Sequence, residues 1–89
     1  MKGVYLEVTY RHGRPMAAYL YLERRPGDVA ARTEKVGEGL LLDLTADGRP
    51  MGIEIASPAA ASLEALNRAL ESVHLAPLSS DDVAPLVVA

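Results

Sequence analysis

The sequence contains no cysteine, no tryptophan and no phenylalanine. Without cysteine the chain can form neither a disulfide nor a thiolate metal site. A cysteine-free composition also suits a reducing compartment, so we expect a cytoplasmic protein. Because tyrosine is the only aromatic residue present, the core must be built from Leu, Val, Ile, Ala and Met, with the four tyrosines at its margins.

Positive charge and long apolar runs are scarce as well. The formal net charge is -3, whereas a protein that neutralises nucleic-acid phosphates needs a basic face, so a nucleic-acid partner is not expected. Arg11, His12 and Arg14 form a basic cluster, which we interpret as charge gathered at a turn in preference to a binding patch. No run of about 18 apolar residues occurs, so no membrane span is expected. The N-terminal segment has a glutamate within its apolar stretch and is unlike a signal peptide.

The first part of the chain has the pattern of five short strands. Apolar and polar side chains alternate within each strand, as in a sheet with one buried face, and Gly, Pro and Asp mark the turns between them. One run, 30–36, is highly charged, which suits the edge of a sheet. The expected strands cover residues 4–10, 17–23, 30–36, 40–45 and 50–55.

The last two strands are expected to form a hairpin around Asp47-Gly48. Paired strands share their faces, so the loop between them must hold an even number of residues, either Asp47-Gly48 alone or residues 45–48. The same parity places Asp43 and Glu54 together on the opposite, partly polar face. The apolar side chains of both strands should then be buried together: Leu40, Leu42, Leu44, Met51, Ile53 and Ile55.

One helical pattern follows the strands. Ser62 is the expected N-cap, and Pro77 is expected to end the helix, because proline disfavours helical geometry at the residue before it. Beyond it, residues 79–89 are predicted to form a short capped turn and an apolar tail. The apolar stripe that should pack on the sheet recurs at spacings of three and four residues: Leu63, Leu66, Leu70 and Val73.

These elements predict a single α+β domain, since 89 residues supply only one core. We expect an about five-stranded, mainly antiparallel meander over residues 1–56. One C-terminal helix, over residues 57–78, should pack on one face of the sheet, with a short helical turn near the C-terminus.

Two groups of side chains on the uncovered sheet face are candidates for function. Asp43 and Glu54 form the first group, a carboxylate pair of the kind used for ligand binding or acid-base chemistry, although solvated charge on a wet face is the interpretation we favour. The second group is a candidate partner interface, because tyrosine is favoured at interfaces: Tyr5, Tyr19, Tyr21 and Leu41. Neither His12 nor His74 has a second ligand at metal spacing, so we expect no metal and no cofactor.

The run ARTEKVGEGLLLDLTADGRPMGIEI, preceded by VTY and AYLYL, resembles the small bacterial family catalogued as domain of unknown function 2283. The resemblance spans about residues 8 to 57, and its most specific part is a Gly-Ile-Glu-Ile strand after an Asp-Gly-Arg turn. RHGRPM at 11–16 departs from the family's more acidic turn, and Tyr21 stands where arginine is usual. The directly corresponding residues are Thr33, Glu34, Asp43, Asp47, Gly48, Arg49, Gly52, Ile53, Glu54 and Ile55.

The resemblance itself implies no activity. Some members of the family are encoded beside small toxin-like proteins, which implies an antitoxin-like partner role as one option. From the residues, the chain lacks a convergent set of catalytic groups, and a deep pocket is hard to build at this size. We therefore expect a non-enzymatic interaction module that forms a homo-oligomer or binds a partner protein; the alternative is a small-molecule-binding or hydrolytic protein that uses Asp43 and Glu54.

Overall fold

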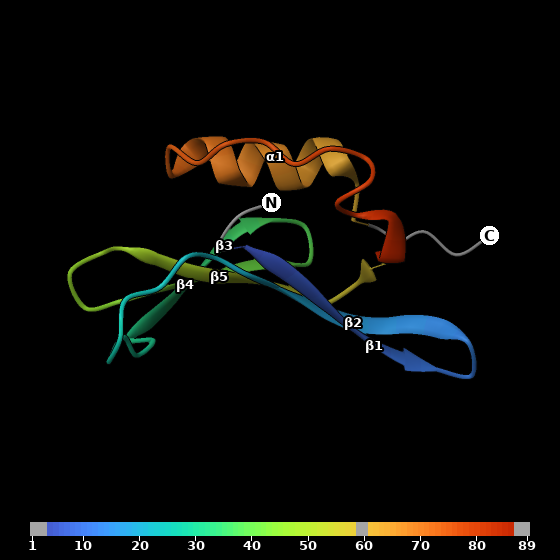
Figure 1. Cartoon of the computed structure of the whole chain (residues 1–89), viewed down its shortest axis with the longest axis horizontal. Coiled ribbons are helices and arrows are strands. Elements are labelled where there is room, and N and C mark those ends of the chain that lie inside the picture. The colour runs from blue at the N-terminus through green and yellow to red at the C-terminus, as the bar shows by residue number, and fades with distance from the viewer. Residues whose placement is uncertain (1–3, 59–60, 87–89) are drawn as a thin grey trace.

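A computed structural model describes residues 4–58 and 61–86 of the chain. It shows one five-stranded sheet in which every strand pair is antiparallel, and one α-helix that lies along one face of the sheet (Figure 1). The predicted α+β class is therefore confirmed. The elements are β1 (Tyr5–Arg11), β2 (Arg14–Tyr21), β3 (Arg32–Gly37), β4 (Leu40–Leu44), β5 (Pro50–Ile55), α1 (Leu63–Ser72) and the short 3-10 helix η2 (Ala84–Leu86).

The strand order is β1-β2-β5-β4-β3, which departs from a simple meander at one point. The last strand, β5, lies in the centre of the sheet between β2 and β4, so the connection 22–31 passes from β2 to the far edge. The meander prediction assumed that consecutive strands are neighbours, which fails only for β2 and β3. The charged β3 lies at an edge, as expected, and the apolar β5 takes the centre, where both its sides are paired.

The core lies between α1 and the face of the sheet that it covers, which we call the inner face. Leu66, Ala69 and Leu70 of α1 are buried against this face. Every apolar side chain that the hairpin argument assigned to the core is buried there, which confirms the predicted faces of β4 and β5: Leu40, Leu42, Leu44, Met51, Ile53 and Ile55.

The loop between β4 and β5 differs from the prediction. Leu44 pairs with Pro50, so the loop 45–49 holds an odd number of residues, and the expectation of an even number is wrong. A register shift between Asp43 and Leu44 leaves Met51 as an extra residue in β5. This bulge offsets the odd loop, so the apolar side chains of both strands still share one face.

Helix α1 begins directly after the predicted N-cap, Ser62, and it ends earlier than predicted. The Ser62 hydroxyl caps it by accepting a hydrogen bond from the Ala65 N–H at 3.0 Å. Its end is set by His74, whose φ of 62° is left-handed, and by the Leu75 N–H, which donates to the Leu70 carbonyl at 2.9 Å. This is a Schellman ending. The predicted span of 57–78 and the role given to Pro77 are therefore wrong, because the chain leaves the helix before it reaches the proline.

The segment after α1 folds back onto the helix. The Asn67 side chain donates to the Leu78 carbonyl at 3.1 Å and accepts from the Leu78 N–H at 2.7 Å. The Asp82 carboxylate then accepts from the Ser79 N–H at 2.8 Å, which makes the predicted capped turn that leads into η2. Leu78 and Val83 of this segment are buried in the core. The predicted apolar tail falls mostly on residues 87–89, outside the described residues.

Candidate functional site

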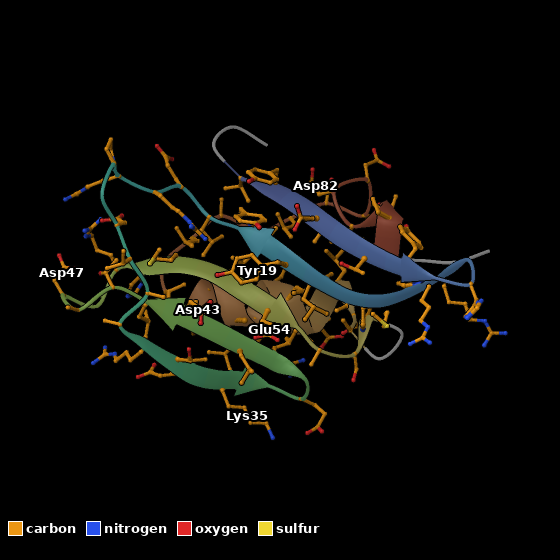
Figure 2. The ribbon with its side chains drawn as sticks, turned by 90° about the horizontal axis from the view of Figure 1, so that it is seen from below. Tyr19, Lys35, Asp43, Asp47, Glu54 and Asp82 are labelled. Carbon is orange, nitrogen blue, oxygen red and sulfur yellow. The ribbon has the colours of Figure 1, made fainter. Side chains whose placement is uncertain are left out.

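The face of the sheet opposite α1, here called the outer face, carries every residue that the sequence analysis selected (Figure 2). Its side chains form two rows that cross all five strands. The first row, in the order β1-β2-β5-β4-β3, is Tyr5, Tyr21, Gly52, Asp43 and Thr33. The second row, in the same order, is Glu7, Tyr19, Glu54, Leu41 and Lys35.

Three tyrosines form an aromatic cluster at one side of the outer face. The rings of Tyr5 and Tyr21 are stacked, with centroids 4.4 Å apart, and Tyr19 lies 4.7 Å from Tyr21 in a tilted arrangement. The Arg24 guanidinium lies 5.2 Å from the Tyr21 ring centroid, within cation–π distance. Tyr5 is nevertheless 57% exposed, so a large part of the cluster remains open to a partner.

Asp43 is the centre of a hydrogen-bond network on this face. One of its oxygens accepts from the Tyr19 hydroxyl at 2.7 Å and the other from the Thr33 hydroxyl at 2.7 Å. Burial, together with the hydrogen bond to the Asp43 carboxylate, raises the pKa of Tyr19 well above its usual value, so the phenol stays protonated and remains a donor. Thr33 was not selected from the sequence as a site residue, because only the register of β3 places it beside Asp43.

Gly52 explains how Tyr19 reaches Asp43. A Cβ atom at position 52 would lie 2.2 Å from Cε1 of Tyr19, so the ring occupies the space above the glycine. Glycine inside a strand marks such a close approach, and this was the one sequence signal for the contact. The ring therefore crosses β5 from β2 to reach the carboxylate on β4.

Asp43 and Glu54 lie on the same face, on adjoining strands, as predicted. In the register they are diagonal neighbours, because Asp43 pairs with Gly52 and Glu54 pairs with Leu41. Both oxygens of Asp43 already accept from neutral hydroxyl groups, whereas Glu54 is exposed. The direct neighbours of Asp43 are thus the hydroxyl groups of Tyr19 and Thr33, and both of its oxygens are engaged.

The Asp47-Gly48-Arg49 turn has a structural task that the sequence analysis missed. The Arg49 guanidinium binds Asp28 through two hydrogen bonds of 2.9 and 2.8 Å and Asp47 through a third of 3.0 Å. The Asp28 side chain is only 9% exposed, and the pKa of its carboxyl is lowered by the Arg49 hydrogen bonds and by the Arg25 N–H. This contact fastens the β2–β3 connection to the β4–β5 loop, which no local sequence pattern could show.

The basic cluster forms the tip of the β1–β2 hairpin. His12 and Gly13 have φ values of 52° and 76°, as a two-residue type I′ turn requires, and Arg11 pairs with Arg14 across it. The cluster therefore lies at a turn, as its sequence interpretation proposed.

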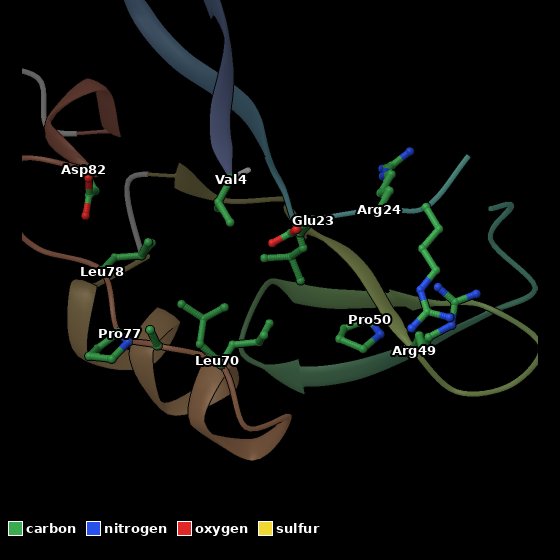
Figure 3. A pocket seen from close by; sticks show the side chains of 13 residues that line it. Val4, Glu23, Arg24, Arg49, Pro50, Leu70, Pro77, Leu78 and Asp82 are labelled. Carbon is green, nitrogen blue, oxygen red and sulfur yellow. The ribbon is translucent and has the colours of Figure 1, made fainter. Parts of the chain in front are cut away.

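A hollow of about 680 Å³ lies away from the outer face, between the end of β2, the start of β5 and the segment after α1 (Figure 3). Its apolar wall includes Leu70, Pro77 and Leu78, and Arg24 and Arg49 stand at one end. Arg49 is engaged by Asp28 and Asp47, and Arg24 by the Met51 carbonyl. Two of the three arginines in the lining, Arg24 and Arg49, are therefore already paired.

Within residues 4–58 and 61–86, no three His, Asp or Glu side chains are grouped so that they could share a metal ion. In the same part of the chain, α1 is the only α-helix, and it is too short to cross a membrane.

The fold and the outer face together define a small α+β domain with one open sheet face. Residues 17–57 match the model of the family described as protein of unknown function DUF2283. The matched segment runs from β2 through β5 and contains Tyr19, Asp43, Gly52 and the Arg49–Asp28 contact. The comparisons with curated proteins and with solved structures found no match.

Proposed function

We propose that the protein is a protein-interaction module that self-associates through its outer face. The observation that carries the proposal is the exposed tyrosine cluster on a sheet face that α1 does not cover. One helix can cover only one face of a sheet, and tyrosine supplies a large contact area at a low cost in side-chain entropy. Clustered aromatic side chains of this kind mark interaction surfaces.

The surroundings of the cluster also support protein binding. Tyr19 is fixed by Asp43, and the Tyr21 hydroxyl donates to Glu7 at 3.3 Å, so two of the three rings are held in place before a partner arrives. A surface that is already ordered loses less entropy on binding. Two exposed charged residues, Glu7 and Lys35, lie on the edge strands at either side of the aromatic and aliphatic side chains, as in the polar rim of an interface.

The hydrolytic and small-molecule alternative has less support. It needs Asp43 to be available, yet both oxygens of this carboxylate are engaged by Tyr19 and Thr33. An antitoxin-like role would use the same outer face toward a different protein. That role would appear as a complex of unlike chains and not as a dimer of this chain.

Tyr5→Asp tests the proposal directly. Tyr5 is exposed and stacks on Tyr21, so this substitution places a charge on the cluster while it leaves the Tyr19–Asp43 hydrogen bond intact. We expect the sedimentation coefficient of the wild-type protein to rise with concentration and that of Tyr5→Asp to stay at the monomer value. Val29→Asp is the matched control, because Val29 is 72% exposed in the β2–β3 connection, outside the outer face.

Equal association of wild type and Tyr5→Asp would contradict the proposal. So would a wild-type protein that remains a monomer at every concentration. Circular dichroism of both variants provides the check that the monomer is still folded.

A further inference from the structure

We infer that two copies of the chain pack outer face to outer face around a two-fold axis that runs along β5. This inference rests on the proposed self-association and adds its geometry. The carrying observation is the distribution of charge and apolar surface over the two rows of the outer face. A two-fold axis along β5 places opposite charges of the two copies against each other, whereas an axis across the strands does not.

The central position of β5 determines which strands of the two copies face each other after this rotation. Two strands lie on each side of β5, so a two-fold axis along this strand and between the sheets exchanges the two edges. Strand β1 then lies over the partner's β3, and β2 lies over the partner's β4. Each row of side chains meets the same row of the partner in reverse order. Strands that remain nearly parallel across the interface are also the common arrangement of packed sheets.

The ends of the second row become complementary in charge. They are Glu7 and Lys35, both exposed, so each glutamate faces the partner's Lys35. Between them, the Tyr19 ring leans over Gly52 on the axis, so the two Tyr19 rings of the dimer meet near the centre of the interface. Two opposite-charge pairs therefore lie at the two ends of the row, and such pairs fix the register of an interface.

The first row is also compatible with this rotation. Tyr21 faces the partner's Asp43, and Tyr5 faces the partner's Thr33, so each tyrosine hydroxyl meets a polar side chain. Gly52 lies on the axis itself, and the space above it is filled by the Tyr19 ring.

The other rotation, around an axis across the strands, gives poorer contacts. It places Asp43 over the partner's Leu41 and Lys35 over the partner's Thr33. The carboxylate then faces an aliphatic side chain, and the lysine gains no opposite charge from the partner. Only the axis along β5 gives Glu7 and Lys35 an oppositely charged residue of the partner, so we choose this axis.

One contact in the chosen arrangement is unfavourable, and it is informative. Glu54 lies on the axis and faces the partner's Glu54, so two like charges meet at the centre of the interface. Glu54→Gln removes this repulsion and should make the dimer about three- to tenfold tighter, an effect of the size of one partly exposed charge pair.

A charge swap tests the axis. Glu7→Lys and Lys35→Glu each turn two attractive pairs of the dimer into repulsive pairs, so we expect each alone to raise the dimer dissociation constant about tenfold in sedimentation equilibrium. The double variant Glu7→Lys with Lys35→Glu restores both pairs and should return to within about threefold of the wild type. Glu71→Lys and Arg68→Glu, both exposed on α1, make the same changes in net charge away from the interface and should have no effect.

The outcomes separate this inference from the proposed function. If Tyr5→Asp dissociates the dimer but the double charge variant fails to restore it, self-association through the outer face stands and the axis along β5 is wrong. Single charge variants that dimerise like the wild type also overturn the axis. A wild-type monomer at every concentration, or a complex formed only with a different protein, overturns the inference and the self-association together.

Discussion

Gly52 and Tyr19 form one structural unit. The glycine lies in the central strand, where it lowers intrinsic strand stability, and the tyrosine ring covers it from the neighbouring strand. The ring gains a fixed position and a hydrogen bond to Asp43 in return. Either residue alone would be a poor choice for its position, so the two are expected to depend on each other energetically.

We therefore predict that Gly52→Ala destabilises the protein by about 1–3 kcal/mol, because the added methyl group would collide with the Tyr19 ring. Urea denaturation followed by circular dichroism measures this cost. In a Tyr19→Ala background the ring is gone, and the cost of Gly52→Ala should fall to near zero or change sign. Equal costs in the two backgrounds would show that the ring does not occupy the space above Gly52.

Helix α1 is the element that covers the inner face, and few residues carry this contact. Leu66 and Leu70 are buried, whereas Leu63 and Val73, at the two ends of the predicted stripe, are only half-buried. Ala69 lies between Leu66 and Leu70 in the sequence. It was not part of the predicted stripe, yet it is also buried. The contact therefore centres on the middle of the helix, with the small Ala69 side chain allowing close approach to the sheet.

Leu66→Asp should lower the free energy of unfolding by at least about 3 kcal/mol, since it removes a central apolar contact and buries a charge. Glu71→Lys, an exposed position on the same helix, should change it by less than about 0.5 kcal/mol. Urea midpoints measure both effects. Similar midpoints for the two variants would mean that α1 does not pack through Leu66.

The elements also show which features a sequence can predict. Alternation and helical spacing report which side chains are buried, and they gave the faces of β4 and β5 and the stripe of α1 correctly. The helix end could not be predicted, because a non-glycine residue such as His74 rarely adopts a positive φ. The odd loop was also missed, since the bulge at Met51 leaves no mark on the alternation of Ile53 and Ile55.

Contacts between distant segments were the least predictable part of the site. The Asp28–Arg49 contact joins residues 21 positions apart, and Thr33 reaches Asp43 only through the pairing of β3 with β4. The candidate residues themselves could be placed on one face, because strand parity fixes faces without knowledge of the neighbour. The strand order could not be predicted, because the alternation of side chains within a strand is the same whichever strand lies beside β2.

For the whole molecule, the family-matched segment 17–57 and the folded unit are not the same. The segment holds β2 through β5 but lacks α1, which covers the inner face. Alone it would leave Leu20, Leu42 and Ile53 exposed to water, each of which is fully buried in the whole chain. Even for the whole chain of 89 residues, the surface buried on folding gives only marginal stability.

We predict that a peptide of residues 17–57 shows no cooperative urea transition, whereas the full chain unfolds in one. Circular dichroism and intrinsic tyrosine fluorescence, recorded on both at the same concentration, test this. A cooperative transition of the peptide with monomer mass would show that the four strands are stable without α1.

The central place of β5 has a consequence for how the chain folds during synthesis. The β1–β2 and β3–β4 hairpins can each form as soon as their residues leave the ribosome, but neither can pair with the other. Both must wait for β5, whose backbone supplies the hydrogen bonds to β2 on one side and to β4 on the other. Until residue 55 has emerged, two hairpins with unpaired edges coexist, and such edges are prone to pair with other chains. The joining of the sheet is thus a late, long-range step, because the pairing of Tyr21 with Gly52 closes the segment 22–51.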